Sequence, residues 1–146
     1  MNEILLINGP NLARLGARKP EVYGSVSLSS LTTKLQNHCE NSGYKIVPFQ
    51  SNHEGNIIDF VENNHEAVGM IINPGALMVS GWSLRDCLED FPKYKIEVHI
   101  SNIWTRETFR HVSILSPVVN GVIAGLGIRG YTLALNCILS HKSEVS

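Results

Sequence analysis

ILLINGP, residues Ile4–Pro10, joins four consecutive branched apolar side chains directly to an Asn-Gly-Pro turn. A short apolar run bounded by glycine and proline predicts a strand that ends where the turn begins. GMIINPG, residues 69–75, repeats the pattern with Asn-Pro-Gly as the stop. Two short strands are therefore predicted, each followed by a tight turn that carries an asparagine.

Strand and helix patterns alternate along the chain on either side of these segments. Apolar spacing predicts strands at Ile4–Ile7, Tyr44–Phe49, Val68–Ile72, Ile96–Ile100 and Val118–Ala124, with helices between them and a last helix at Tyr131–Leu139. This alternation predicts a parallel sheet with helices on both faces. We expect one flavodoxin-like α/β domain over residues 1–146, a three-layer sandwich with strand order 2-1-3-4-5.

The composition is that of a globular domain. The 146 residues are 43% hydrophobic and 17% charged with a net charge of −1, so disorder and nonspecific binding to nucleic acid or membranes are not expected. No apolar stretch reaches the length of a membrane span, and the first residues do not resemble a signal peptide. A cytoplasmic location is therefore expected. Cys39, Cys87 and Cys137 lie far apart and are expected to be buried, reduced thiols.

Polar side chains follow four of the predicted strands. Asn11 follows the first, QSNHEG at residues 50–55 the second, Asn73 the third, and His99 and Ser101 the fourth. Ligands of such sheets bind beyond the carboxyl ends of the strands. We therefore predict a ligand site at this edge of the sheet.

Other motifs carry less weight. Gly125, Gly127 and Gly130 match a dinucleotide-binding pattern, but only 16 residues follow, too few for the next strand and the acidic residue of such a site. The histidines form no H-E-x-x-H sequence and no cysteine pair is present, so no metal site is expected. G-x-S-x-G is absent, which argues against a serine hydrolase.

The loop between the first strand and the first helix is longer than a plain connection requires. It contains Arg14, Arg18 and Lys19 close to Tyr23. A neighbouring cation favours the phenolate form of a tyrosine, so Tyr23 could remove a proton next to a carbonyl group. His99, at a strand end, is the matching candidate for the acid.

Asparagines and arginines supply the remaining groups for such chemistry. Asn11 and Asn73 could hold a developing oxyanion or a water molecule. Arg106 and Arg110 in TRETFRH lie four residues apart, the spacing of one helical face, and paired arginines suit a carboxylated or hydroxylated substrate. These residues alone indicate a lyase or isomerase that acts on a small oxygenated acid.

Several longer motifs make the chain similar to a known family. ILLINGPNL, RKPEVYG, QSNHEG, IINPGA, EVHISN, RETFRH and SPVVNGVIAGLGIRGYTLAL occur in the order and spacing of the type II 3-dehydroquinate dehydratases. The resemblance covers nearly the whole chain and implies a flavodoxin-like fold. It also implies a lyase that converts 3-dehydroquinate to 3-dehydroshikimate, without metal or organic cofactor, in the shikimate route to aromatic amino acids or in quinate breakdown.

The resemblance assigns the chemical steps to four residues. Tyr23 would be the base that takes a proton beside the ketone, and Arg18 would keep it ionised. Asn11 would position a water molecule that steadies the enolate, and His99 would protonate the leaving hydroxyl group. The long loop that carries Arg18 and Tyr23 would then be a lid that closes over the substrate and shuts out water.

Four residues would contact the substrate by the same resemblance. The side chain of Asn73 and the backbone of Ile100 and Ser101 would hold its carboxylate, and Arg110 would bind ring hydroxyls. This small molecule is the ligand that the resemblance implies, with neither nucleic acid nor a membrane as a partner.

Three further residues would support the site. Arg106 would belong to the lid and its surroundings, and Glu97 would orient His99. Asp86 would reach toward the site of a neighbouring subunit, because the family forms trimers that assemble into dodecamers. Self-association of this chain is therefore expected.

Four positions depart from the family pattern. Val79 stands where the family has a histidine that touches a ring hydroxyl, Trp104 and Val112 also replace common histidines, and Trp82 lies in an altered run. Loss of a hydrogen bond to a substrate hydroxyl costs about 0.5–1.5 kcal/mol. The alternatives are weaker binding, a contact restored from elsewhere, or a pocket reshaped by the tryptophans for a related cyclic hydroxy-keto acid. A non-catalytic protein is disfavoured because the predicted catalytic set is intact.

Overall fold

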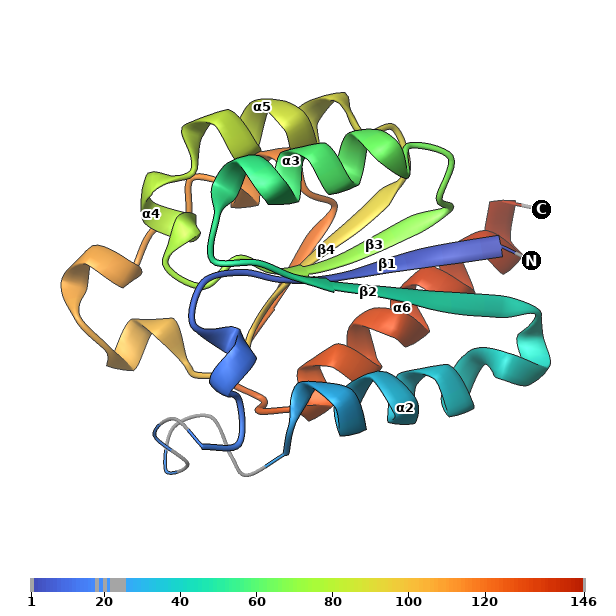
Figure 1. Ribbon diagram of the computed structural model, residues 1–146, viewed down its shortest axis with the longest axis horizontal. Coiled ribbons are helices and arrows are strands. Elements are labelled where there is room, and N and C mark those ends of the chain that lie inside the picture. The colour runs from blue at the N-terminus through green and yellow to red at the C-terminus, as the bar shows by residue number, and fades with distance from the viewer. Residues whose placement is uncertain (1, 18, 20, 22–25, 146) are drawn as a thin grey trace.

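The computed structural model describes residues 2–17, 19, 21 and 26–145. A parallel five-stranded sheet in the order β2-β1-β3-β4-β5 forms its centre (Figure 1). The strands are β1 (Asn2–Asn8), β2 (Tyr44–Gln50), β3 (Gly69–Asn73), β4 (Tyr94–His99) and β5 (Gly121–Ala124). The predicted fold class and strand order are confirmed.

Helices cover both faces of the sheet. In Figure 1, α3 (Glu54–Asn63) and α5 (Trp82–Asp90) lie above it, and α2 (Leu28–Cys39) and α6 (Arg129–Val145) lie below it. The shorter helices are α4 (Leu77–Ser80) and the 3₁₀ helices η1 (Leu12–Arg14), η2 (Glu40–Ser42), η3 (Ile103–Thr105), η4 (Thr108–Arg110) and η5 (Ser116–Val118). Within the described ranges, none of the helices combines the length and the apolar character needed to cross a membrane.

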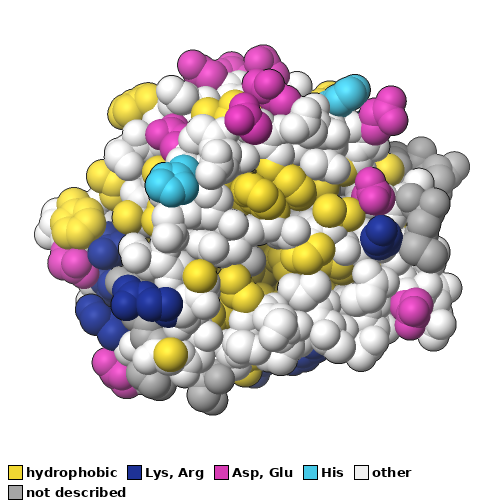
Figure 2. Space-filling view, viewed as in Figure 1, with side chains coloured by type: hydrophobic (Ala, Val, Ile, Leu, Met, Phe, Trp, Pro, Cys, Tyr) yellow, Lys and Arg dark blue, Asp and Glu magenta, His cyan; other side chains and the backbone are white. Residues whose placement is uncertain are grey.

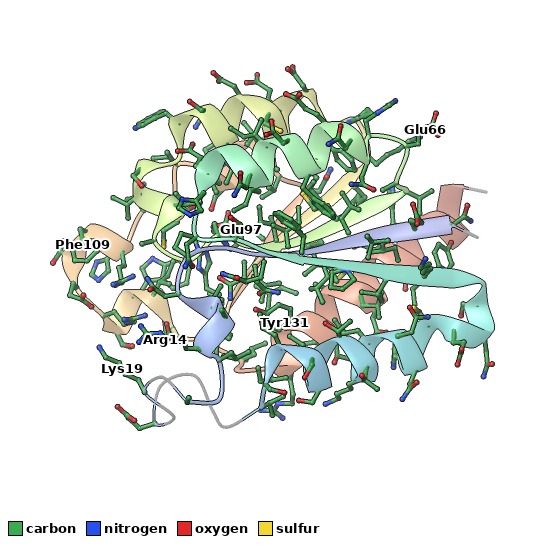
Figure 3. The ribbon with its side chains drawn as sticks, in the orientation of Figure 1. Arg14, Lys19, Glu66, Glu97, Phe109 and Tyr131 are labelled. Carbon is green, nitrogen blue, oxygen red and sulfur yellow. The ribbon has the colours of Figure 1, made fainter. Side chains whose placement is uncertain are left out.

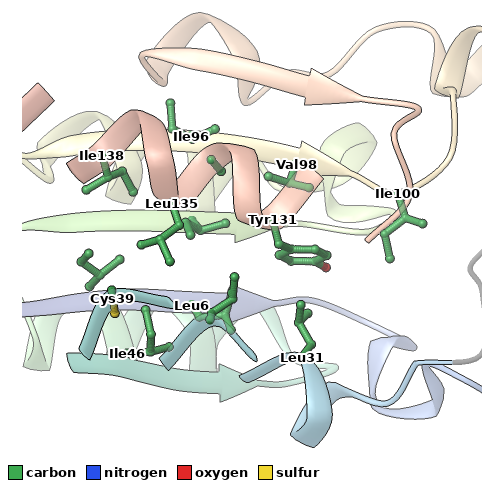
Figure 4. Packing of buried hydrophobic residues seen from close by; sticks show 14 of the residues in the cluster. Leu6, Leu31, Cys39, Ile46, Ile96, Val98, Ile100, Tyr131, Leu135 and Ile138 are labelled. Atoms are coloured by element: carbon green, nitrogen blue, oxygen red, sulfur yellow. The ribbon is translucent and has the colours of Figure 1, made fainter. Parts of the chain in front are cut away.

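The apolar run of β1 is buried on both faces of the sheet. Ile4 and Leu6 belong to the cluster formed with α2 and α6, whereas Leu5 and Ile7 belong to the cluster formed with α3 and α5. Successive side chains of a strand point to opposite faces, so a strand between two helical layers needs a continuous apolar run. Figure 4 shows the first cluster, in which Tyr131 of α6 is enclosed.

The ends of neighbouring strands are level with one another. Asn8 of β1 pairs with Gln50 of β2 on one side and with Asn73 of β3 on the other. His99, the last residue of β4, pairs with Ala124, the last residue of β5. The register therefore brings the polar residues that end or follow the strands to one edge, as predicted.

The differences from the predicted elements lie mainly at their ends. β5 begins at Gly121 rather than at Val118, because Ser116–Val118 forms η5. α6 extends to Val145, beyond the predicted end at Leu139. The sequence does not indicate α4 or the 3₁₀ helices, because segments of three or four residues are too short to show a helical apolar period.

The sequence suggested that all three cysteines are buried, but the structure differs from this expectation. Cys39 is buried and Cys87 is half-buried, but Cys137 is exposed, and all three are free thiols. The buried stripe of α6 consists of Tyr131, Ala134, Leu135 and Ile138. Cys137 falls outside this stripe, so the expectation of a buried thiol is wrong for it.

Candidate active site

A cleft lies at the edge of the sheet where the strands end. Six polar residues line it, namely Asn11, Asn73, His99, Ser101, Arg106 and Arg110. Apolar residues that include Leu12, Met78 and Ile103 form much of the remaining wall. Figure 2 shows Lys and Arg side chains gathered at the left of the molecule, the end toward which the strands of Figure 1 run. The cleft occupies the position that the sequence predicts for a ligand site.

The loops after β1 and β3 contact each other. The backbone N–H of Gly9 donates to the carbonyl of Asn73 at 2.8 Å, and a Cβ atom on Gly9 would lie only 2.4 Å from the carbonyl oxygen of Pro74. Glycine is therefore needed for this close approach, which brings Asn11 and Asn73 to the same cleft. The N–H of Asn11, a residue with a left-handed backbone (φ 70°), donates to the Asn52 side-chain oxygen at 3.0 Å.

Glu97 and His99 form a buried pair on β4. The two residues are two positions apart and so lie on the same face of the strand, and they are 0% and 5% exposed. Nε2 of His99 hydrogen-bonds to one carboxylate oxygen of Glu97, and the Ser116 hydroxyl donates to the other oxygen at 2.8 Å. Because Nε2 is engaged, Nδ1 is the ring nitrogen left for a bound molecule.

The surroundings of Glu97 keep its carboxylate ionised. Burial alone raises the pKa of this group, but hydrogen bonds from His99, Ser113 and Ser116 and the charge of His99 outweigh burial, so the pKa lies below its ordinary value. An ionised Glu97 accepts the proton of Nε2 and thereby fixes the tautomer and orientation of the imidazole ring. The pair can therefore present one nitrogen of defined orientation to the cleft.

Arg106 and Arg110 bring two positive charges to the cleft. Their side chains are 16% and 17% exposed, and each forms an ion pair with Glu107. Arg106 also donates to the Ser101 hydroxyl at 3.3 Å. The sequence predicted that the two arginines share one helical face. This prediction is wrong, because the segment forms the separate turns η3 and η4. Two guanidinium groups beside an imidazole suit an anionic ligand. Among the described residues, no group of His, Cys, Asp or Glu side chains could hold a metal ion.

Comparison with known proteins assigns the chain to a family. The profile of the family described as Dehydroquinase class II matches residues 2–139. The chain belongs to the class II dehydroquinases. It is similar to the 3-dehydroquinate dehydratase of Roseiflexus castenholzii, with 49% identity over 97% of this chain and 91% of that protein. The 3-dehydroquinate dehydratase of Bacillus pumilus is 45% identical over 100% of both chains. The crystal structure of a type II dehydroquinase from Butyrivibrio crossotus matches with a TM-score of 0.90 at 41% identity, covering 94% of this chain and 97% of that chain.

Most of the residues predicted from the dehydroquinase motifs meet at the cleft. Seven of them line it, namely Asn11, Asn73, His99, Ile100, Ser101, Arg106 and Arg110, and Glu97 lies against His99. Asp86 is exposed on α5 and is not among the described residues that line the cleft.

The predicted base and its partner, Tyr23 and Arg18, lie outside the described residues. Figure 3 shows Arg14 and Lys19, which belong to the same long loop, at the end of the molecule where the cleft opens. Glu97 lies nearer the middle of the sheet in that view. The roles expected for Tyr23 and Arg18 stay predictions.

The departures from the dehydroquinase pattern lie outside the cleft lining. Val79 is half-buried, and its neighbour Met78 is the residue that lines the cleft. Trp82, Trp104 and Val112 are 61%, 57% and 72% exposed, and none of them is part of the lining formed by the described residues. The lining formed by the described residues of one chain therefore gives no support to the possibility that the tryptophans reshape the pocket.

Several residues that shape this dehydroquinase site carry no signal in the sequence. Ser113 and Ser116 reach Glu97 from the segment before β5, and neither stands in a motif that points to a carboxylate. Met78 lines the cleft as an ordinary apolar residue. Asn52 is the exception, because it belongs to the polar QSNHEG segment expected at this edge.

Proposed function

We propose that this chain is a 3-dehydroquinate dehydratase, a lyase that removes water from 3-dehydroquinate to give 3-dehydroshikimate. The observation that carries the proposal is the Glu97–His99 pair, which opens onto the same cleft as Asn73 and Arg110. A proton donor beside anion-binding groups is what elimination from a carboxylated ring requires. Membership of the class II dehydroquinases and the names of the similar proteins from R. castenholzii and B. pumilus support the same activity.

The proposed reaction begins with Tyr23 as a tyrosinate. Tyr23 takes a proton from the carbon beside the ketone, while Arg18 favours the ionised phenol. The electron pair of the broken C–H bond moves onto the ketone oxygen, and Asn11 steadies this enolate through a water molecule. The enolate then re-forms the ketone, a carbon–carbon double bond forms, and the bond to the hydroxyl oxygen breaks. In this step His99 acts as an imidazolium with a proton on each ring nitrogen: it keeps the Nε2 proton bound to Glu97 and gives the Nδ1 proton to this oxygen, so that water departs.

The proposed substrate contacts follow the walls of the cleft. Asn73 and the backbone of Ile100 and Ser101 would hold the carboxylate, and Arg110 would meet ring hydroxyls, with Arg106 supporting the lid region. The presence of all five residues in one lining supports this assignment. The comparisons do not favour the alternative of a related cyclic hydroxy-keto acid. The sequence departures that suggested it are not part of the lining that the described residues form.

We also propose that the chain self-associates into trimers and that trimers assemble into a dodecamer. Trp82 and Asp86 support this proposal, because residues four apart share one face of a helix and both side chains are exposed on α5. If Asp86 reaches the site of a neighbouring subunit, Trp82 enters the same interface. Phe109, at 55% exposure, adds a further aromatic side chain beside the cleft residue Arg110.

The activity is tested by following the ultraviolet absorbance of the conjugated enone after purified protein is mixed with 3-dehydroquinate and a chelator. We expect a rise for the wild type and a rate at least about 10²-fold lower for Tyr23→Phe, which loses the proposed base. Tyr44→Phe is the matched control, because Tyr44 begins β2 at the opposite edge of the sheet. Folded wild-type protein without turnover contradicts the proposed activity, and full turnover by folded Tyr23→Phe contradicts the proposed base.

A further inference from the structure

Three buried polar residues from distant parts of the chain form a line of hydrogen bonds beside the cleft. Asn8 ends β1, Asn73 ends β3 and Tyr131 lies in the first turn of α6, and they are 3%, 4% and 0% exposed. The Tyr131 hydroxyl donates to Oδ1 of Asn8 at 2.6 Å. Nδ2 of Asn73 donates to the same hydroxyl oxygen at 2.8 Å. Figure 4 shows the Tyr131 ring within the apolar cluster, with its hydroxyl toward the ends of the strands.

The hydrogen bonds in this line can run in only one direction, from Asn73 through Tyr131 to Asn8. The backbone N–H of Gly75 can only donate, and it donates to Oδ1 of Asn73 at 3.1 Å, which places Nδ2 of the amide on the side of the Tyr131 hydroxyl. The Tyr131 hydroxyl has one hydrogen, which goes to Asn8, and it therefore accepts from Asn73. Burial raises the pKa of Tyr131, so the hydroxyl keeps this hydrogen at neutral and moderately alkaline pH.

The same count leaves one N–H of the Asn73 amide for another partner. An asparagine amide carries two N–H groups, and one of them is given to Tyr131. Asn73 is part of the cleft lining, so the second N–H is the donor that it can offer to a bound anion. A reversed amide would turn its oxygen toward a carboxylate instead, and the two oxygens would repel each other.

We propose that Tyr131 is a positioning residue whose hydroxyl holds the Asn73 amide in the orientation that offers an N–H to the substrate carboxylate. This inference rests on the proposed function, in which Asn73 binds the carboxylate of 3-dehydroquinate. Tyr131 does not line the cleft itself and acts only through Asn73. An N–H bound to the carboxylate in both the ground state and the transition state contributes to substrate binding more than to the chemical step.

The first experiment compares steady-state kinetics of Tyr131→Phe and the wild type with 3-dehydroquinate as substrate. Tyr131→Phe keeps the buried ring and removes the hydroxyl, and we expect KM to rise about tenfold while kcat changes much less. Leu135→Val is the matched control, because it weakens packing in the same helix and cluster without a bond to Asn73. A purely structural role for Tyr131 predicts lower thermal stability with wild-type KM in both variants, and this result overturns the inference.

A double-mutant cycle then tests whether Tyr131 acts through Asn73. We expect Tyr131→Phe to leave KM unchanged when it is added to Asn73→Ala, whereas an equal additional rise in KM overturns the inference. If Tyr131→Phe does not fold, Asn8→Ala takes its place, because it removes the acceptor that orients the Tyr131 hydrogen. Asn8→Ala should raise KM in the same direction by a smaller factor, and wild-type KM in this variant overturns the inference.

The wild type distinguishes this inference from the proposed function. Wild-type turnover combined with unchanged KM in the variants overturns the role of Tyr131 alone. Absence of turnover by folded wild-type protein overturns the proposed function, and the role of Tyr131 falls with it.

Discussion

Glu97 is fully buried, and a carboxylate is tolerated at such a position only because other groups bind it. Burial raises its pKa, whereas His99, Ser113 and Ser116 lower it by a larger amount. The ionised carboxylate then determines which ring nitrogen of His99 is left for the cleft. At the scale of the residue, the acid of the proposed reaction thus depends on hydroxyl groups that line no part of the cleft in the described structure.

Ser116→Ala removes the 2.8 Å hydrogen bond to Glu97. We expect the free energy of unfolding to fall by about 1.5–3 kcal/mol, because a charged buried group loses a donor. We also expect kcat to fall by about tenfold, because the carboxylate that orients His99 is held less firmly. Chemical denaturation and enone formation measure the two effects. Ser116→Thr keeps a hydroxyl and should recover most of both, and a wild-type kcat in Ser116→Ala contradicts the expectation.

The same variant has a predicted pH dependence. The folded pKa of Glu97 lies below the ordinary value of 4.5, so its contribution to stability is fully present above that value and is lost as the pH falls through the lowered pKa. Ser116→Ala raises the folded pKa toward the unfolded value, so less stability should be lost on acidification and the loss should end at a higher pH than in the wild type. Thermal unfolding of both proteins from neutral pH down to about pH 3 measures the difference, and identical acid sensitivity argues against it.

At the scale of the element, β4 serves different purposes at its two ends. Lys95, near the start of the strand, is 8% exposed, and its ammonium group donates to the carbonyls of Leu88 at 2.7 Å and Phe91 at 2.6 Å. The last carbonyls of a helix lack partners within the helix, and a cation there is favoured by the helix dipole. Lys95 therefore caps α5, while His99 at the other end of β4 belongs to the cleft.

Lys95→Met removes this cap and keeps most of the aliphatic side chain. We expect the free energy of unfolding to fall by about 1–3 kcal/mol, because buried carbonyl groups lose their donor. KM should not change, because Lys95 lies at the end of β4 away from the cleft. Lys93→Met is the matched control at an exposed position and should change stability by less than about 0.5 kcal/mol. Equal stability of the two variants, measured by chemical denaturation, contradicts the capping role.

At the scale of the whole molecule, several large apolar side chains remain exposed. Trp82, Trp104, Phe109 and Val112 are each more than half exposed. Aromatic residues are enriched at protein–protein interfaces relative to the rest of the surface. Three of the four are also positions where the sequence departs from the family pattern. Their exposure fits the proposed self-association better than a change in the substrate.

Trp82→Ser should weaken this association. We expect sedimentation of the wild type to give a mass that is a multiple of three times the 16.1 kDa of the chain. The serine variant should shift toward smaller species, because it removes an aromatic side chain from the proposed interface. Leu133→Ser changes another exposed apolar residue, at 42% exposure on α6, and should leave the mass unchanged. A monomeric wild type, or a Trp82→Ser variant of wild-type mass, argues against this interface.

Residues that directly end or follow strands were predictable as site residues. Asn73 and His99 are the last residues of β3 and β4, and parallel strands in register bring their ends together. Arg106 and Arg110 were expected on a helical face, but the segment forms 3₁₀ turns, and only their place in the cleft agrees with the prediction. Short turns depend on the contacts around them more than on periodic spacing, which explains the error.

The sequence by itself determined the layers of this protein. The unbroken apolar run Ile4–Ile7 requires burial on both faces of the sheet. Leu31 and Leu35 recur at helical spacing, so their side chains must face the sheet. Both patterns can be recognised in the sequence because apolar periodicity is a local property. Only the tertiary structure decided which polar groups meet. Tyr131 and Asn8 are 123 residues apart in sequence and 2.6 Å apart in their hydrogen bond. Such a contact requires the packed register of several elements at once, because hydrogen bonds tolerate only a few tenths of an ångström.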